Sequence, residues 1–235
     1  MRRPRTHSAR WLAAATAAVA ACAFTTAASA DDNQAWLKFS AECSPFENGL
    51  YLSVEERLKF DSVRFLDEET LMLVGYRFSP YFKAAIGHRI VRERRPDERH
   101  LLSEQRQTTD LCFTAPEFWM LKFDFRSRFE LCDKHNAQAY MRYRERFRLR
   151  TSWSVTDFRI SPYVSNEVFL SDRPKSGDSD LFNRNRAEIG LSFRPIPSLD
   201  SLSCNLYFMV QHDKDTSTSS WSATNVYGLD IAFSF

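Results

Sequence analysis

The chain has 235 residues, of which 43% are hydrophobic and 14% aromatic, with 32 Lys and Arg against 30 Asp and Glu. The slight basic excess belongs to the first 30 residues, which hold four arginines and no acidic residue, so that 28 basic residues remain against 30 acidic ones. This balance gives no bulk-charge argument for binding nucleic acid, and no such partner is expected. After these 30 residues, no apolar run approaches the length of about 18 residues that a membrane-spanning helix needs.

The amino terminus has the layout of a secretory signal peptide. Arg2, Arg3, Arg5 and Arg10 form a basic region, 11–21 is apolar and rich in alanine, and Ala28-Ser29-Ala30 is a small-residue cleavage motif. We therefore predict a cleaved signal over residues 1–30, with Ala28 and Ala30 as its cleavage determinants, and one domain over residues 31–235. Cys22 follows Val19-Ala20-Ala21, which leaves a lipoprotein site as the alternative.

Most of the remaining chain alternates apolar and polar residues with period two, as β-strands with two different faces do. Eleven segments show this pattern, namely 35–42, 50–60, 71–78, 82–93, 105–113, 119–131, 139–150, 160–170, 187–193, 202–210 and 227–235. The connections near 61–69, 94–104, 171–180 and 213–221 are long and polar, whereas those near 79–81, 115–117 and 195–200 are short and contain proline. Long external loops alternating with short turns are typical of membrane barrels.

These segments predict an all-β fold, an antiparallel up-and-down transmembrane β-barrel. Because bacterial single-chain barrels have an even number of strands, we expect about 12 strands, with 10 as the alternative. A secreted β-sandwich also alternates and is the competing architecture. The aromatic apolar faces, the successive charges on the polar faces and an ending inside a strand favour the barrel.

The last nine residues alternate strictly, with Tyr227, Leu229, Ile231, Phe233 and Phe235 on one face. This ending resembles the terminal strand of bacterial outer-membrane β-barrels, in which the final aromatic residue is part of the assembly signal. The resemblance implies that Tyr227, Ile231, Phe233 and Phe235 engage the barrel-assembly machinery. It also implies a cell outer-membrane location, in a Gram-negative-type bacterium, in contact with the outer-membrane lipids. The opposite face of the strand is small, so we expect it to leave space inside the barrel.

Charged side chains gather on the inward parity of the middle strands. The predicted lumen-facing set is Lys122, Asp124, Arg126, Arg128, Glu130, Arg142, Arg144, Arg146, Arg148, Arg184, Arg186 and Glu188. Guanidinium groups are always ionised and suit carboxylate, sulfate or phosphate groups, and along a pore they favour anions. The first hypothesis is a narrow, porin-like channel that prefers small anionic solutes or acidic oligosaccharides.

The alternative is a closed structural or surface-interaction barrel. Glu55 and Glu167 share the inward parity with the carboxylates above, and buried guanidiniums must be paired. A small barrel fills its interior with side chains, so an Arg–carboxylate network could close the lumen.

No catalytic, metal or cofactor site is predicted. His88, His212 and Ser127 share the outward parity, where an outer-membrane lipid hydrolase would place them, but no nucleophile elbow or Ser/His motif accompanies them. We expect no enzyme, and a lipid-modifying activity is the third hypothesis. The histidines form no metal-ligand cluster and no cofactor is expected. The sequence leaves the disulfide state open for the four cysteines, which are Cys43, Cys112, Cys132 and Cys204.

Several short motifs occur in an order that resembles a known family. They are Trp36, Glu55-Glu56-Arg57, Arg95-Pro96, the pair formed by 126–130 and Arg142-Tyr143-Arg144, and 182–186. Together they resemble the uncharacterised outer-membrane β-barrel family catalogued as domain-of-unknown-function family 2490, over most of residues 33–235. The charged 97–104 loop and the cysteines depart from the family pattern. The resemblance implies an outer-membrane barrel and brings no catalytic residue and no substrate.

Overall fold

The computed structural model describes residues 33–61, 64–94, 101–134, 138–151, 160–172, 181–196, 199–214 and 220–235. The strands are β1 (Asn33–Cys43), β2 (Leu50–Asp61), β3 (Phe65–Ser79), β4 (Phe82–Arg94), β5 (Leu101–Thr114), β6 (Leu121–Lys134), β7 (Tyr140–Thr151), β8 (Ser161–Ser171), β9 (Phe182–Phe193), β10 (Leu202–Lys214) and β11 (Trp221–Ser234). Among these residues there is no helix long and apolar enough to span a membrane. The predicted leader, with Ala28 and Ala30, lies outside the described residues.

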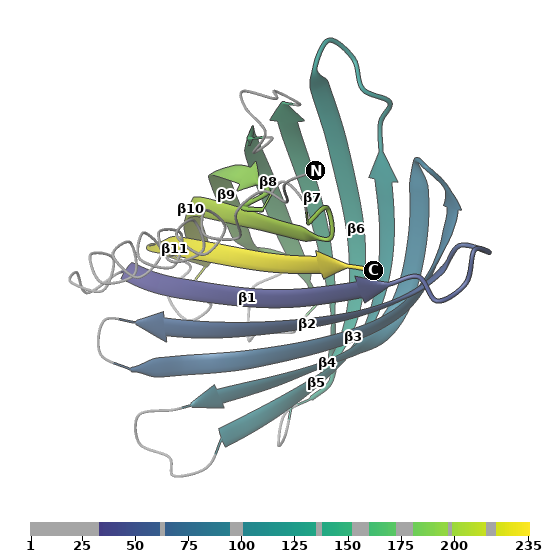
Figure 1. Cartoon of the computed structure of the whole chain (residues 1–235). Coiled ribbons are helices and arrows are strands. Elements are labelled where there is room, and N and C mark those ends of the chain that lie inside the picture. Colours follow the sequence, from purple (N-terminus) through teal and green to yellow (C-terminus); the bar gives the residue numbers. More distant parts are fainter. Residues whose placement is uncertain are drawn as a thin grey trace, which may run out of the picture.

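The strands close into one barrel in sequence order (Figure 1). Each strand pairs antiparallel with the next, and β1 and β11 complete the ring as a parallel pair, from Asn33 opposite Asn225 to Glu42 opposite Ser234. The predicted all-β barrel is therefore confirmed. The described part contains eleven strands, a number between the two expected, because the parallel pair lets an odd number close.

The odd number places the two ends of the described chain at opposite ends of the barrel. We call one end of the barrel the loop end; it holds the connections β2–β3, β4–β5, β6–β7, β8–β9 and β10–β11. We call the other end, where Phe235 lies beside Ser44, the turn end. β3 begins at Phe65 rather than at residue 71 and β5 at Leu101 rather than at 105, so two loops are shorter than expected. The alternation is hidden at the start of β3 because Glu68 and Glu69 put charge on both faces.

The outer wall is apolar and aromatic, while charged side chains are buried within. Along β6, Phe123, Phe129 and Leu131 are exposed, whereas Arg128 and Glu130 are buried. A row of contacting rings crosses the outer wall from β3 to β7, formed by Phe78, Phe82, Phe113, Phe125 and Phe147, with neighbouring centroids 4.6 to 6.2 Å apart. This arrangement is inverted relative to a water-soluble protein, in which charged residues are almost never fully buried unless they are paired.

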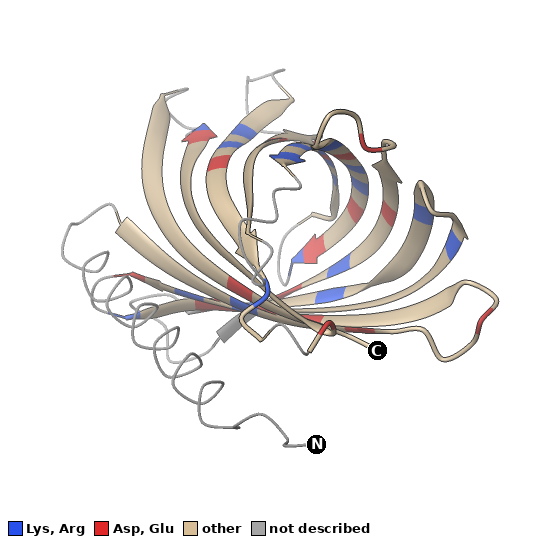
Figure 2. Ribbon diagram, turned by 45° about the horizontal axis from the view of Figure 1, so that its top comes forward, with Lys and Arg blue, Asp and Glu red and all other residues tan. Residues whose placement is uncertain are grey.

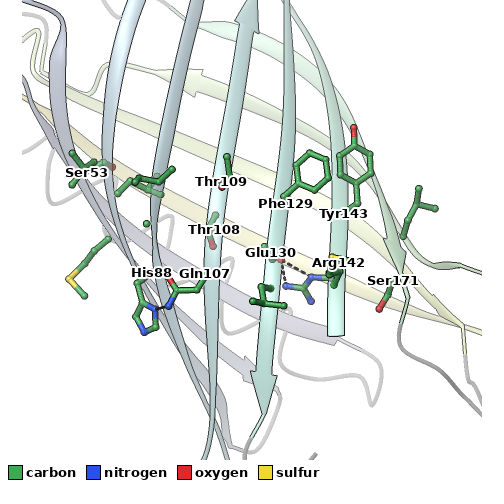
Figure 3. Close-up of a pocket in the computed structure, with 18 of the residues that line it drawn as sticks. Ser53, His88, Gln107, Thr108, Thr109, Phe129, Glu130, Arg142, Tyr143 and Ser171 are labelled. Atoms are coloured by element: carbon green, nitrogen blue, oxygen red, sulfur yellow. Dashed lines mark hydrogen bonds and ion pairs between the residues drawn. The ribbon is translucent and has the colours of Figure 1, made fainter. Parts of the chain in front are cut away.

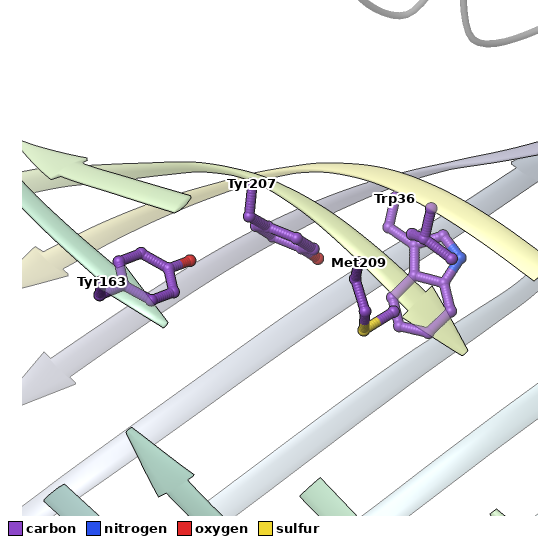
Figure 4. Close-up of a cluster of buried hydrophobic side chains, with 5 residues drawn as sticks. Trp36, Tyr163, Tyr207 and Met209 are labelled. Carbon is purple, nitrogen blue, oxygen red and sulfur yellow. The ribbon is translucent and has the colours of Figure 1, made fainter. Parts of the chain in front are cut away.

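Apolar and aromatic side chains fill the part of the interior under β10 and β11. Trp36, Tyr163, Tyr207 and Met209 point into the barrel there (Figure 4). A Cβ atom added to Gly228 would lie only 1.9 Å from Cζ of Tyr207. The expectation that the small face of the last strand leaves open space is therefore wrong at this position, because the tyrosine ring of β10 lies directly over the glycine.

Candidate functional site in the barrel interior

Most inward-parity charges of β6 to β9 belong to a layer of ion pairs, and Figure 2 shows basic and acidic bands on these strands. Arg128, Glu130, Arg144 and Arg186 are buried. The rest of the predicted set is partly buried and comprises Lys122, Asp124, Arg126, Arg142, Arg146, Arg148, Arg184 and Glu188. The alternation of β-strands explains this shared placement, since every second residue of a strand faces the same side.

Glu167 of β8 is one centre of the layer. Its carboxylate accepts hydrogen bonds from Arg126 at 2.8 Å and Arg144 at 3.0 Å, and it lies 3.4 Å from a guanidinium nitrogen of Arg186. These three arginines come from β6, β7 and β9, so one carboxylate ties three strands together. The Glu167 side chain is only 8% exposed. Such a carboxylate is stabilised by its partners, because a buried charge without one is costly.

Glu130 of β6 is the second centre. It accepts a hydrogen bond from Nε of Arg142 at 2.7 Å and another from Arg144 at 3.2 Å, and Nε of Arg89 lies 3.7 Å away. Arg89 also contacts Glu69, which accepts a hydrogen bond from Lys59 at 2.6 Å. Sequence reasoning missed Arg89 and Glu69 because apolar residues stand on both parities beside them, Leu71 and Met72 in β3 and Ile90 and Val91 in β4, and such a pattern does not identify the inward face.

Further pairs extend the layer along the barrel. Arg128 contacts Asp110, Arg148 lies 3.2 Å from Glu188, and Arg150 lies 3.0 Å from Asp124. Arg184 contacts Asp213 at the loop end. Lys38 of β1 lies 2.5 Å from Asp230 of β11, where these two strands close the barrel. Lys122 lies opposite Arg150 in the register of β6 and β7.

Charge is nevertheless unevenly divided around the wall. β6 to β9 carry eleven Lys or Arg side chains and six Asp or Glu side chains, whereas the other seven strands carry ten and twelve. Among the described residues Arg146 forms no ion pair with a carboxylate; in the strand register it lies opposite Arg126 of β6 and Glu167 of β8, and Arg148 is close by. One side of the interior is therefore strongly positive.

Two spaces lie within this interior. A cavity of about 380 Å³ near the loop end is lined by residues of nine strands, Trp36, Arg144, Phe169 and Arg186 among them. A neck of about 40 Å³ lies deeper and is lined by Arg146, Arg148, Glu167 and Tyr207. The neck has room for very few waters, since one water needs roughly 10–15 Å³ of such space.

A larger hollow of about 1140 Å³ lies on the outer wall (Figure 3). Its lining includes exposed apolar side chains such as Ile86, Phe129 and Met141. His88 shares a hydrogen bond of 3.1 Å with Gln107, while the Ser127 hydroxyl donates one of 3.1 Å to Tyr143. Within the described ranges no serine–histidine hydrogen bond joins Ser127 to His88 or His212.

Other expected features can be placed as well. Cys43, Cys112, Cys132 and Cys204 are unpaired. Across the described ranges no group of three or more His, Cys, Asp or Glu could hold a metal ion. On the last strand, Phe233 and Phe235 are exposed at the turn end, and Tyr227 and Ile231 are partly buried.

Comparison with known proteins agrees with the fold. A solved structure described as the NanC porin in a rhombohedral crystal form superposes with a TM-score of 0.50 at 10% sequence identity, covering 84% of this chain and 91% of that chain. At that identity the likeness shows a porin-like barrel fold. No curated protein matches the chain. The family model described as "Protein of unknown function (DUF2490)" matches residues 33–222. The chain therefore belongs to the DUF2490 family, as its ordered short motifs indicated.

Proposed function

We propose that this protein is a bacterial outer-membrane β-barrel whose arginine-rich lumen admits small anionic solutes. The exposed aromatic outer wall supports the membrane location, because an outward apolar band with aromatic rings is what lipid requires of a barrel. The basic, alanine-rich leader supports export. The aromatic ending, with Tyr227, Ile231, Phe233 and Phe235, supports recognition by the barrel-assembly machinery.

The excess of basic side chains on β6 to β9 carries the anion preference. Eleven cations against six carboxylates leave this wall positive, and Arg146 lies in the neck beside two further arginines. In a narrow, weakly hydrated passage, such fixed charge lowers the free energy of an anion and raises that of a cation. The preference should depend on Arg146 more than on the arginines that share a carboxylate.

A closed structural or surface-interaction barrel is the second candidate. The neck of about 40 Å³ favours it, as does the Glu167 carboxylate that draws three arginines together. Ion pairs of this kind hold side chains in place over the inner face of neighbouring strands. In that case the positive wall would stabilise the barrel and conduct nothing.

The reversal potential of the purified protein in a planar bilayer, measured across a salt gradient, separates the two candidates. With an anion-preferring lumen, the reversal potential has the same sign as the equilibrium potential of chloride. A cation preference, or membranes that contain folded barrel and carry no current, would refute the channel. Phospholipid or lipopolysaccharide turnover by the same preparation would instead support the lipid-modifying hypothesis.

A further inference from the structure

We infer that the cavity of about 380 Å³ at the loop end is a binding site for a small oxyanion that carries two or more negative charges. The inference rests on the proposed function, because it names the class of solute that the lumen would receive. The chemistry shared by its candidate ligands is the carboxylate, phosphate or sulfate group, for which guanidinium forks are the matching donors.

Aromatic rings hold the basic side chains of this cavity in place. The Trp36 ring lies under Arg57, Lys59 and Arg186, whose charged centres are 5.5, 4.8 and 4.9 Å from its centroid. The Phe169 ring lies under four guanidiniums, at 4.7 to 5.8 Å, and these are Arg142, Arg144, Arg184 and Arg186. A ring face attracts a cation without neutralising it, so these six cations are positioned while their charge stays available to a ligand.

The carboxylates within reach are too few for the cations that share them. The ion pairs of the six stacked cations involve Asp67, Glu69, Glu130, Glu167 and Asp213. Glu69 and Glu130 also contact Arg89, and Glu167 also contacts Arg126. Eight cations thus share five carboxylates. The lining of the cavity as a whole, which also includes Glu93 and Glu104, holds seven Lys or Arg and four Asp or Glu, so positive charge is in excess in a partly dehydrated space, where unpaired charge is costly.

Donor groups are also left over. Nε of Arg57 and Nε of Arg144 are buried and have no hydrogen-bond partner within the part of the chain that the structure describes, and the Arg144 side chain is only 4% exposed. Arg184 is the most accessible of the stacked arginines for which an ion pair is described, with 33% of its side chain exposed, and it stands at the start of β9. A ligand that reaches Arg184 first and then approaches Arg142 and Arg186 would engage donors from two strands.

The size of the cavity sets the size of the ligand. About 380 Å³ is within the range of pockets that enclose small molecules, whereas the neck below it holds about 40 Å³. A polyvalent anion therefore stops in the cavity, and chloride remains small enough to continue. This difference predicts that a bound oxyanion reduces the chloride current.

Isothermal titration of the full, detergent-purified chain with citrate, inorganic phosphate, sulfate and chloride tests the inference at low ionic strength. We expect saturable binding of at least one of the three oxyanions, tighter than any binding of chloride. Arg184→Gln should weaken that binding roughly tenfold or more, since hydrogen bonds to charged groups are the strong ones. The matched control is Arg150→Gln, which removes an interior arginine at the turn end that pairs with Asp124, and it should leave binding unchanged.

Comparing the oxyanions identifies the ligand chemistry, because citrate alone would indicate carboxylates and phosphate or sulfate alone the tetrahedral anions. Absence of saturable binding by all three, or equal weakening by both substitutions, would overturn the site. Saturable binding without any conductance would leave the site standing and refute the channel. Anion-selective conductance that none of the oxyanions reduces would refute the site and leave the channel standing.

Discussion

Replacing Glu167 by glutamine should destabilise the barrel markedly. The substitution keeps the shape of the side chain and removes the negative charge that Arg126, Arg144 and Arg186 share at 2.8 to 3.4 Å. Glu167 and Arg144 are 8% and 4% exposed, so water compensates little. Breaking a buried ion pair by removing one partner costs about 3–5 kcal/mol, and we expect a loss in that range for Glu167→Gln.

Unfolding in urea, after the protein has been refolded into lipid vesicles, measures this loss through tryptophan fluorescence and heat-dependent gel mobility. Asp200→Asn is the matched control, since it removes a carboxylate paired with Arg194 in a turn, where the Asp200 side chain is 77% exposed. Exposed pairs contribute about 0–1 kcal/mol, so the control should unfold much like the parent protein. A Glu167→Gln loss no larger than that of the control would refute the reasoning that the carboxylate organises the layer.

Three further predictions concern the turns, the last strand and the cysteines. Trp119 and Met120 have φ values of 50° and 67° in a two-residue hairpin turn, so Trp119→Asn with Met120→Gly should raise the free energy of unfolding by about 1 kcal/mol, and an unchanged value would contradict the strain. Gly228→Ala should cost about 1–3 kcal/mol because the new methyl group meets Tyr207, and adding Tyr207→Leu should restore most of it if the contact is the cause. The mature chain should run identically on gels with and without reductant, because its four cysteines are unpaired; a mobility shift would reveal a disulfide.

Strand positions could be predicted where the two faces of a strand differ in character. β6 and β7 were identified to within a few residues because apolar, largely aromatic residues alternate with charged ones along most of their length. The start of β3 was missed because it carries charge on both faces. Glu68 contacts Arg92 on the outer wall, whereas Asp67 and Glu69 contact Lys59 inside the barrel. A local pattern cannot distinguish such a segment from a loop.

The closure of the barrel could not be predicted from alternation. Eleven segments were visible, but the rule that bacterial barrels have even strand numbers moved the expectation to 10 or 12. The parallel pairing of β1 with β11 depends on how the two ends of the chain meet, from Asn33 beside Asn225 onward. Period-two sequence patterns carry no information about the direction of a neighbouring strand.

Parity assigned the arginines of β6, β7 and β9 to the inner face, but it missed Arg57 and Arg89 and could not identify the ion-pair partners. Glu167 was recognised as an inward residue, yet its three contacts come from strands up to 41 residues away along the chain. The stacking of four arginines around Phe169 depends on the strand register, which sets Arg144 of β7 and Arg184 of β9 opposite Phe169 of β8. The structure also separates two arginines of the same parity, because Arg144 forms ion pairs with two buried carboxylates, whereas Arg146 forms none within the described residues.

The change in reversal potential caused by Arg146→Glu, measured in a planar bilayer across a salt gradient, tests most directly the claim that this wall selects anions. The substitution places a carboxylate in the neck, opposite Arg126 and Glu167 in the strand register, and lowers the fixed charge of the neck by two. We predict that Arg146→Glu moves the reversal potential clearly toward the equilibrium potential of the cation. Arg194→Glu makes the same charge change in a turn and should leave the reversal potential unchanged. An unchanged reversal potential for Arg146→Glu in a folded, conducting barrel would contradict the account.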